Sequence, residues 1–253
     1  MLRRHVEGMV IIPSMQEQTY LQRPEYLGAR IVTLDRPAPL ARFDSVLVEN
    51  KSGARLAVNH LIEHGHERIA CIGLSNDLYT MKMRHEGYLE ALKIARLKPE
   101  SYLDCSALDS LAPALARVLD RPDAPTAFFS TNNLTMRSTL LALNELGVAI
   151  PKGVAIVGFD DFELAEILNP TLTVVRQPSQ EMGSVGATLL FKRLNDPDEI
   201  PETGERIVLP VELIVRRSCG CGGGIASDKG YASSESVSLA ATQAPSRPVL
   251  SRS

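Results

Sequence analysis

The sequence predicts an α/β protein with doubly wound parallel sheets, and two features of its pattern support that prediction. Short runs of β-branched and aliphatic residues recur along the chain, and most are apolar throughout rather than alternating, as in strands covered on both faces. Stretches with helical periodicity lie between these runs, and strands that alternate with helices favour a parallel sheet. The runs lie at residues 8–14, 29–35, 44–50, 68–74, 126–132, 154–160 and 171–177, and residues 206–216 add a strand that Pro210 interrupts.

Two of the predicted helices have clear ends. The first covers residues 52–64 and stops at Gly65, a residue that commonly ends helices. Its apolar stripe, at the 3.6-residue period, is Ala54, Ala57, Val58, Leu61 and Ile62. The second covers residues 133–146, begins at a capping Asn132 or Asn133 and ends at Gly147. Its expected apolar stripe is Leu134, Leu140, Leu141 and Leu143.

Three further helices and a tail complete the expected order of elements. Helices are predicted at 80–96 and 107–119, and a third runs from Pro178, which suits a first helical turn, to about Leu194. The inward residues of the third are Met182, Val185 and Leu189. Beyond Cys219 glycine, serine, alanine and proline dominate, so residues 222–253 are predicted to be a disordered tail.

Composition excludes several classes of protein. The chain has 253 residues, of which 44% are hydrophobic and 23% charged, and these are ordinary globular values. A net charge of -3 gives no basic footprint for nucleic acid, and the absence of tryptophan, with only 6 Phe and 6 Tyr, leaves few aromatics for base stacking. The sequence shows no signal peptide and no apolar run near the roughly 20 residues of a membrane span. We therefore expect a soluble, cytoplasmic protein.

Cysteine and histidine spacing gives no recognised metal motif. The four cysteines form no C-x-x-C pair. Cys71 lies in an apolar run and is expected in the core, whereas Cys219 and Cys221 are interpreted as two thiols at a fraying end, with a metal site or strained disulfide as the alternative. His60 and His64 share a helix face, but the glutamate of an H-E-x-x-H site is misplaced, so a solvated helix end is favoured. We expect no metal and no cofactor.

Two adjacent carboxylates, Asp160 and Asp161, follow the apolar run 154–159. Such a pair can bind Mg²⁺, accept a phosphoryl group, grip a polar ligand or cap a following helix. Successive side chains point in different directions, so we assign helix capping to Asp161 and ligand contact to Asp160. A phosphoryl-transfer enzyme would need a lysine and a hydroxyl at neighbouring strand ends, where Asn132 and Gln177 stand instead. Dinucleotide, P-loop and G-x-S-x-G signatures are absent too, and we expect no enzymatic activity.

Several segments, in order, resemble one known family. They are "DSVLVENKSGARLAVNHLIEHGHERIACIG", "MRHEGYLEAL", "PTAFFSTNNLTMRSTLLALNELGVAIPKGVAIVGFDDFELAEILNPTLTVVRQPSQEMG" and "RIVLPVELIVRRSCGC". Together they are similar to the effector-binding core of the lactose/galactose repressor (LacI/GalR) family of transcription regulators, over roughly residues 3–221.

The resemblance implies a fold like that of periplasmic sugar-binding proteins, with two lobes and three crossovers near 48–50, 175–178 and 206–209. The lobes would be 1–48 plus 178–206, which is incomplete, and 49–176 plus 207–221. The implied function is sensing of a sugar or related small polar effector for a regulator, a repressor in many members. The alternative is a sugar-binding component of a transport system.

The same resemblance implies a set of ligand-binding residues. Asp160 would accept hydrogen bonds from sugar hydroxyls, and Arg84, in an R-x-x-G-Y motif, would donate to ligand oxygens. Asn132, Gln177 and, more weakly, Thr80 match further ligand positions. Two departures are Asn133, where the family usually has aspartate, and Cys105, where an aromatic residue often stacks on the sugar.

Partners follow from the family as well. The intact parent would be a homodimer that reads DNA through a helix-turn-helix segment, which this chain lacks, so we do not expect this chain to bind DNA. The sheet carrying residues 9–12 and 30–34 would have an open edge, and we expect the chain to associate through it.

Overall fold

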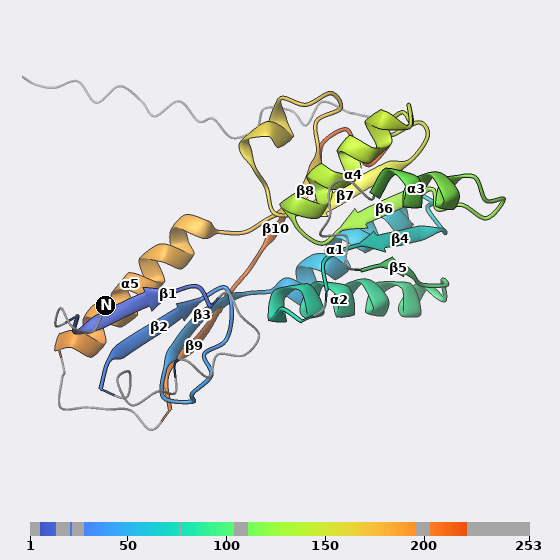
Figure 1. The fold of residues 1–253 in the computed structure, drawn as a ribbon. Helices are drawn as coiled ribbons and strands as arrows, with labels where there is room; N and C mark the ends of the chain where they lie inside the picture. Colours follow the sequence, from blue (N-terminus) through green and yellow to red (C-terminus); the bar gives the residue numbers. More distant parts are fainter. Residues whose placement is uncertain are drawn as a thin grey trace, which may run out of the picture. The chain divides into compact units, whose positions relative to one another are not determined.

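The computed structural model describes residues 6–13, 21, 28–75, 77–103, 111–195 and 203–221. These residues form two largely parallel sheets with helices packed against them, which confirms the α/β class (Figure 1). Three parts of the sequence predictions lie outside the described residues: the tail at 222–253, Cys105, and the start of the helix expected at 107–119.

The first sheet has the strand order β1-β2-β3-β9, and all its strands are parallel. One face packs against α5 (Ser179–Asn195), with Met182 and Leu189 facing inward as expected. Arg193, near the end of α5, donates two hydrogen bonds of 2.9 Å to the buried carboxylate of Asp44 and so anchors the helix on the sheet. The strands are β1 (Gly8–Ile11), β2 (Arg30–Leu34), β3 (Asp44–Val48) and β9 (Arg206–Leu209).

The second sheet has the strand order β10-β8-β7-β6-β4-β5. Every pair is parallel except β10 with β8, which is antiparallel. The carboxyl ends of β4, β6, β7 and β8 therefore meet at one edge, where ligand sites of α/β sheets form. The strands are β4 (Ile69–Ile72), β5 (Glu100–Tyr102), β6 (Ala127–Ser130), β7 (Ala155–Phe159), β8 (Thr173–Arg176) and β10 (Glu212–Ile214).

Helices cover both faces of the second sheet (Figure 1). Successive strand residues face opposite sides: Phe129 packs with α1 and α2, whereas its neighbour Phe128 packs with α3 and α4. This two-sided burial explains why the strands are apolar throughout. The helices are α1 (Asn50–Glu63), α2 (Tyr79–Ala95), α3 (Leu111–Leu119) and α4 (Asn133–Glu145).

The predicted helix ends are confirmed, but the predicted apolar stripe of α4 is only partly right: Leu143 is buried and Leu140 packs against the core. Gly65 and Gly147, each one residue past the C-cap of α1 and α4, have φ of +86° and +67°, and Asn132 caps α4. On α4, however, Leu141 is 58% exposed. The buried face carries hydroxyl residues such as Ser138 and Thr139, which donate to carbonyl oxygens one turn earlier at 3.0 and 2.7 Å. Because this back-bonding satisfies the hydroxyls, the face can be buried.

The structure differs from the sequence predictions in three smaller ways. The short β5 was not predicted, because its residues Glu100–Tyr102 are mostly polar. The segment after Asp161 forms only a 3-10 turn, η5 (Glu163–Glu166). The chain passes from the first sheet to the second at residues 210–211, after the whole of β9, and not within residues 206–209.

None of the helices in the described part of the chain has both the length and the apolar character that a membrane crossing requires.

Candidate ligand-binding site

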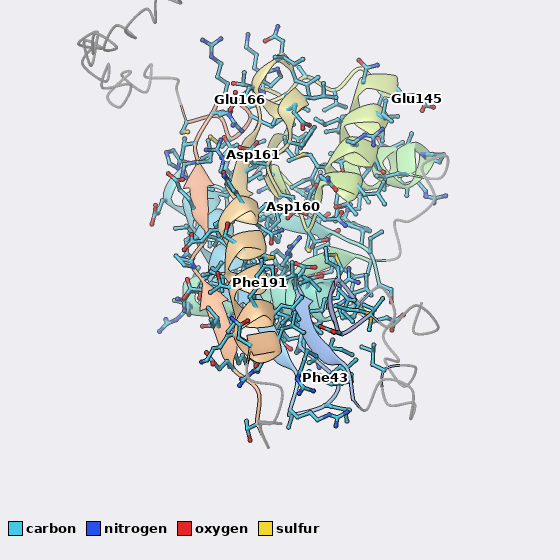
Figure 2. All side chains as sticks on the ribbon, turned by 90° about the vertical axis from the view of Figure 1, so that its left-hand side faces the viewer. Phe43, Glu145, Asp160, Asp161, Glu166 and Phe191 are labelled. Carbon is cyan, nitrogen blue, oxygen red and sulfur yellow. The ribbon has the colours of Figure 1, made fainter. Side chains whose placement is uncertain are left out.

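The candidate site is centred on Asp160, the residue directly after β7 (Figure 2). Its φ of +74° lies in the left-handed region that residues other than glycine rarely adopt. Its backbone N–H donates to the carbonyl oxygen of Val175 in β8 at 2.9 Å, which fixes the turn. The side chain stays 21% exposed. Strained residues of this kind cluster at ligand and active sites.

Arg84 of α2 lies beside Asp160 and is only 2% exposed. Its Nη1 donates to Oδ2 of Asp160 at 3.2 Å and to the carbonyl oxygen of Thr131 at 2.8 Å. Its Nε donates to Oδ1 of Asn50 at 2.8 Å. The guanidinium carbon lies 3.8 Å from the ring centroid of Phe159, a cation–π contact. These partners come from different elements, so the charged pair is held in one arrangement.

Gln177 completes the cluster from the segment that follows β8. Its Nε2 donates to Oδ1 of Asp160, so each carboxylate oxygen of Asp160 has one donor. An ionised carboxylate offers about four acceptor positions, which leaves acceptor capacity for ligand hydroxyls. Of the five residues predicted for the site, the structure thus joins Asp160, Arg84 and Gln177 through hydrogen bonds.

The other two predicted residues have different roles in this structure. Oδ1 of Asn132 accepts from the backbone N–H of Thr135 at 2.9 Å and caps α4. Asn132 follows Thr131, whose carbonyl oxygen binds Arg84, so it lies next to the cluster along the chain. Thr80, in the first turn of α2, is buried at 1% exposure. A ligand reaches Thr80 only if its surroundings move.

Two residues near the charged pair were missed by the sequence analysis. Asn50, the first residue of α1, is buried and accepts from Arg84. Asp35 follows β2 with φ of +67°, as Asp160 follows β7. Burial raises the pKa of Asp35, while the charges of Arg84 and Arg36 lower it and that of Asp160 raises it again. The signal available for both was a polar residue at the end of an apolar run, directly after it for Asp35 and one residue later for Asn50.

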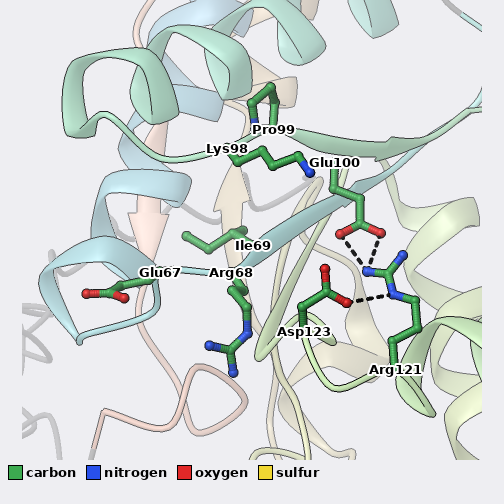
Figure 3. A pocket seen from close by; sticks show the side chains of 8 residues that line it. All are labelled: Glu67, Arg68, Ile69, Lys98, Pro99, Glu100, Arg121 and Asp123. Atoms are coloured by element: carbon green, nitrogen blue, oxygen red, sulfur yellow. Dashed lines mark hydrogen bonds and ion pairs between the residues drawn. The ribbon is translucent and has the colours of Figure 1, made fainter.

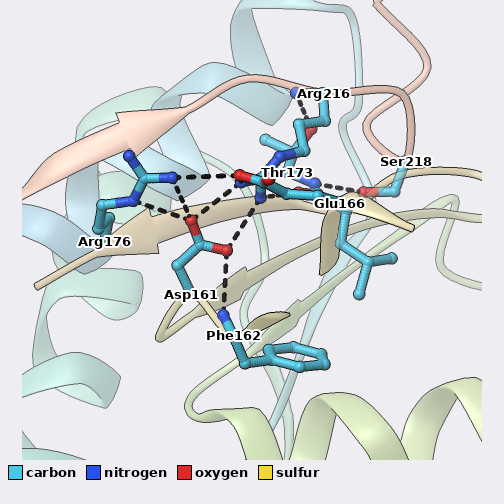
Figure 4. A network of polar contacts seen from close by, with 8 residues as sticks. Asp161, Phe162, Glu166, Thr173, Arg176, Arg216 and Ser218 are labelled. Carbon is cyan, nitrogen blue, oxygen red and sulfur yellow. Dashed lines mark hydrogen bonds and ion pairs between the residues drawn. The ribbon is translucent and has the colours of Figure 1, made fainter. Parts of the chain in front are cut away.

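Asp161 lies beside Asp160 along the chain but belongs to a different network (Figure 4). Its Oδ2 accepts from Nη2 of Arg176 at 2.7 Å and of Arg216 at 2.9 Å. Glu166 accepts from the same Arg216 at 2.8 Å. The assignment of helix capping to Asp161 is therefore wrong: the N-cap of η5 is Phe162, without a side-chain cap bond. Its carboxylate ties the end of β7 to β8 and to the chain after β10.

The interpretation of Cys219 and Cys221 as thiols at a fraying end is also wrong. Cys219 is fully buried and packs in the core formed by α1, α2 and the second sheet, and Cys221 packs against it. His60, expected on a solvated helix end, is buried as well. Cys71 is buried in the same core, as predicted.

The family model described as the periplasmic binding protein-like domain matches residues 58–219, which is well over half of the chain. The chain belongs to this family. The resemblance seen in the sequence is thereby confirmed for the effector-binding core.

Relatives of this periplasmic-binding-protein-like chain include named transcription regulators. The regulator CelR of Thermobifida fusca is 34% identical over 221 residues, which is 85% of this chain and 64% of CelR. A LacI family regulator from Enterococcus faecium, solved with bound ribose, has a TM-score of 0.75 and 27% identity, and the match covers 85% of this chain and 80% of that one. A CelR–cellobiose complex has a TM-score of 0.73 and 32% identity, with coverage of 85% and 66%.

This periplasmic-binding-protein-like chain is shorter than its curated relatives. It spans between 59% and 66% of the length of those it matches, which include repressors named PurR from several bacteria.

A separate hollow of the periplasmic-binding-protein-like domain lies at the opposite edge of the second sheet (Figure 3). It has a volume of about 450 Å³ and is lined by residues before or at the start of β4, β5 and β6. Three of its charged side chains are paired with one another: Arg121 contacts Glu100 at 2.8 Å and Asp123 at 3.3 Å. Ligands of open α/β sheets bind at the carboxyl ends of the strands, so this hollow is a weaker candidate than the Asp160 cluster.

Proposed function

We propose that this chain is the effector-sensing core of a LacI-type transcription regulator and that its effector is a sugar or a related small polyhydroxylated molecule. The observation that carries the proposal is the Arg84–Asp160 pair, with Gln177 on the second carboxylate oxygen. The pair lies at the carboxyl edge of a parallel sheet, where this class of fold binds its ligands.

The chemistry of the cluster suits adjacent hydroxyl groups. A carboxylate accepts hydrogen bonds from two neighbouring hydroxyls, and charge-assisted bonds of this type are roughly twice as strong as neutral ones. Arg84 and Gln177 supply donors for ligand oxygens from two sides of Asp160. Asp35 adds a second, partly buried carboxyl whose charge is coupled to Arg84 and Asp160. Ribose and cellobiose, bound in the two solved relatives, are molecules of this kind.

The regulator assignment is favoured over a transport protein because the curated relatives carry the names of transcription regulators. We propose further that the full protein acts as a homodimer and contacts DNA outside this chain. The effector then shifts the equilibrium between two arrangements only by its difference in affinity for them.

Isothermal titration calorimetry with ribose, cellobiose, other sugars and nucleosides tests the proposal directly. We expect saturable heat with at least one compound, and a loss of affinity of about 10- to 100-fold in Asp160→Asn. That range corresponds to a charge-assisted hydrogen bond of roughly 1.5–3 kcal/mol. Asparagine also tolerates the left-handed backbone, so the substitution removes charge without adding strain.

A matched control is Asp123→Asn, which removes an aspartate from the opposite edge of the same sheet. This variant should bind as the original chain does. Absence of heat with every compound, or equal affinity in Asp160→Asn and Asp123→Asn, would contradict the proposed site.

A further inference from the structure

Three ligand-type side chains converge away from the Asp160 cluster. The Nε2 atom of His60 and the Sγ atoms of Cys219 and Cys221 all lie within 4.8 Å of one another. His60 comes from the last turn of α1, whereas the two cysteines follow β10 near the end of the described chain. His60 and Cys219 are buried, and Cys221 is partly buried.

We propose that His60, Cys219 and Cys221 form a zinc-binding site that joins the end of the domain to α1. Two thiolates and one imidazole are a ligand set that Zn²⁺ accepts, with a water or an added ligand in the fourth position. The site is distinct from the proposed effector site and does not depend on it.

The geometry fits a tetrahedral ion after one small movement. Zn–S bonds of ~2.3 Å and a Zn–N bond of ~2.0–2.1 Å place sulfur and nitrogen about 3.5 Å apart, and Sγ of Cys221 lies 3.6 Å from Nε2 of His60. The same bonds place two sulfurs about 3.7 Å apart, whereas the two Sγ atoms lie at 2.7 Å. The thiols must therefore separate by about 1 Å. The turn between them is made by Gly220, with φ of +78°.

The proton balance of metal uptake is simple. Burial raises the pKa of the Cys219 thiol, but hydrogen bonds with His60 and Cys221 outweigh it and bring the pKa to about 6. Burial and the neighbouring Cys219 raise the pKa of Cys221 to about 11. Zn²⁺ binds thiolates, so any thiol proton still present on the two cysteines passes to water as the metal–sulfur bonds form. No electrons are transferred.

The imidazole of His60 also packs against a neighbouring side chain. The ring of His64 lies against it at a centroid distance of 4.4 Å, and Nδ1 of His64 contacts the carbonyl oxygen of His60 at 2.6 Å. Cys221 is only partly buried, so an ion can enter from its side. Cys71, buried in the same core, lies outside the trio and provides a natural control.

The test uses the full chain, stripped of metal and kept reduced. Titration with Co²⁺ should produce sulfur-to-metal absorption that saturates at one ion per chain and disappears on addition of Zn²⁺. Cys221→Ser and His60→Gln should each weaken metal binding by at least tenfold, and Cys71→Ser should not. The melting temperature of the original chain should rise with Zn²⁺ and fall with a chelator, and Cys221→Ser should lose this response.

Three outcomes would overturn the proposal. One is the absence of stoichiometric Co²⁺ or Zn²⁺ uptake by the reduced chain. Another is metal binding that persists unchanged in folded Cys221→Ser and His60→Gln. The third is a Cys219–Cys221 disulfide in the purified chain, followed by no metal uptake after its reduction.

Discussion

Two neighbouring carboxylates with different surroundings define the chemistry of this protein at the scale of single residues. Asp160 adopts a strained conformation, stays partly exposed and shares its charge with one buried arginine. Asp161 is more buried and is held by Arg176 and Arg216 (Figure 4). The first arrangement leaves acceptor capacity for a ligand, whereas the second fills it with partners from the same chain. The two should therefore respond differently to the same substitution.

We expect Asp161→Asn to destabilise the fold by about 2 kcal/mol, because it leaves a mostly buried Arg216 with only the exposed Glu166 as a charged partner. Burial raises the pKa of Asp161, but Arg216 and Arg176 outweigh it, and the net pKa is lowered. A lowered pKa in the folded state stabilises the protein above the ordinary pKa of an aspartate, about 3.9, and this contribution disappears as the pH falls through the folded-state value.

Thermal unfolding of the two proteins between pH 7 and about pH 3 measures this effect. The difference between them should stay constant from pH 7 to about 5 and shrink below about pH 4. The exposed Asp123→Asn serves as a control and should change stability little at any pH. A difference that grows toward acid pH would contradict the assignment.

The sequence identified candidate residues that follow apolar runs, but it did not identify the side chains that form hydrogen bonds with them. Asp160 stands out because a carboxylate at the end of a buried strand is conspicuous, and the family resemblance added Arg84 and Gln177. Arg216, which holds Asp161, lies 55 residues further along the chain. It reaches Asp161 because β10 pairs antiparallel with β8. Such pairing is a long-range property that no local pattern records.

At the scale of elements, the contact between α1 and α2 positions the arginine of the site. Gly87 of α2 lies against the backbone of α1: an added Cβ would stand 2.2 Å from the carbonyl oxygen of Lys51 and 2.9 Å from Cβ of Ala54. Arg84 lies one helical turn before Gly87, and its partner Asn50 begins α1. Close approach of the two helices thus brings Arg84 to Asn50 and Asp160.

We expect Gly87→Ala to separate these helices, to destabilise the fold by about 1–3 kcal/mol and to weaken effector binding along with it. Backbone, rather than a flexible side-chain end, meets the new Cβ, so the strain has no easy release. Chemical denaturation and calorimetry with the effector measure the two consequences.

The matched control is Gly183→Ala in α5, where an added Cβ meets nothing within 4 Å. That change should be neutral or stabilise the fold by up to about 1 kcal/mol, since alanine is the better helix former. If both alanine variants have the same stability, close helix packing does not position Arg84.

Element boundaries were predictable where physical signals are local. Apolar runs located the strands that are covered on both faces, and glycines after α1 and α4 marked their ends. The buried face of α4 was not predictable in this way, because its threonines and serine satisfy their hydroxyls within the helix. Hydrophobic periodicity assumes that buried means apolar, and α4 violates that assumption.

At the scale of the whole molecule, the sequence does not say which sheet a strand joins. The strands of the two sheets have the same apolar pattern, and β9 pairs with β3 across some 160 residues of chain. Only the family resemblance indicated that the chain changes sheets three times, and the boundaries of the two lobes remain a prediction. In contrast, the structure shows which apolar side chains are exposed, and these side chains bear on how copies of the chain associate.

β1 is one of the two edge strands of the first sheet as far as it is described, and apolar side chains are exposed around it. Val10 on β1 and Ile12 just after it are 40% and 61% exposed, and Phe191 on the adjoining α5 is exposed as well (Figure 2). Unpaired strand edges with apolar flanks favour association between copies. We therefore expect the isolated chain to form oligomers whose mass increases with concentration, as measured by size-exclusion chromatography with light scattering.

Val10→Lys should shift that equilibrium toward the monomer, because a charge on an edge strand opposes pairing with another edge. Ile94→Lys is the matched control: Ile94 lies on α2, away from the first sheet, and is 69% exposed. Its variant should associate as the original chain does. A monomer at every concentration would contradict the expected association altogether. Equal effects of the two lysines would exclude β1 as the associating surface and leave the exposed residues of α5 to be tested next.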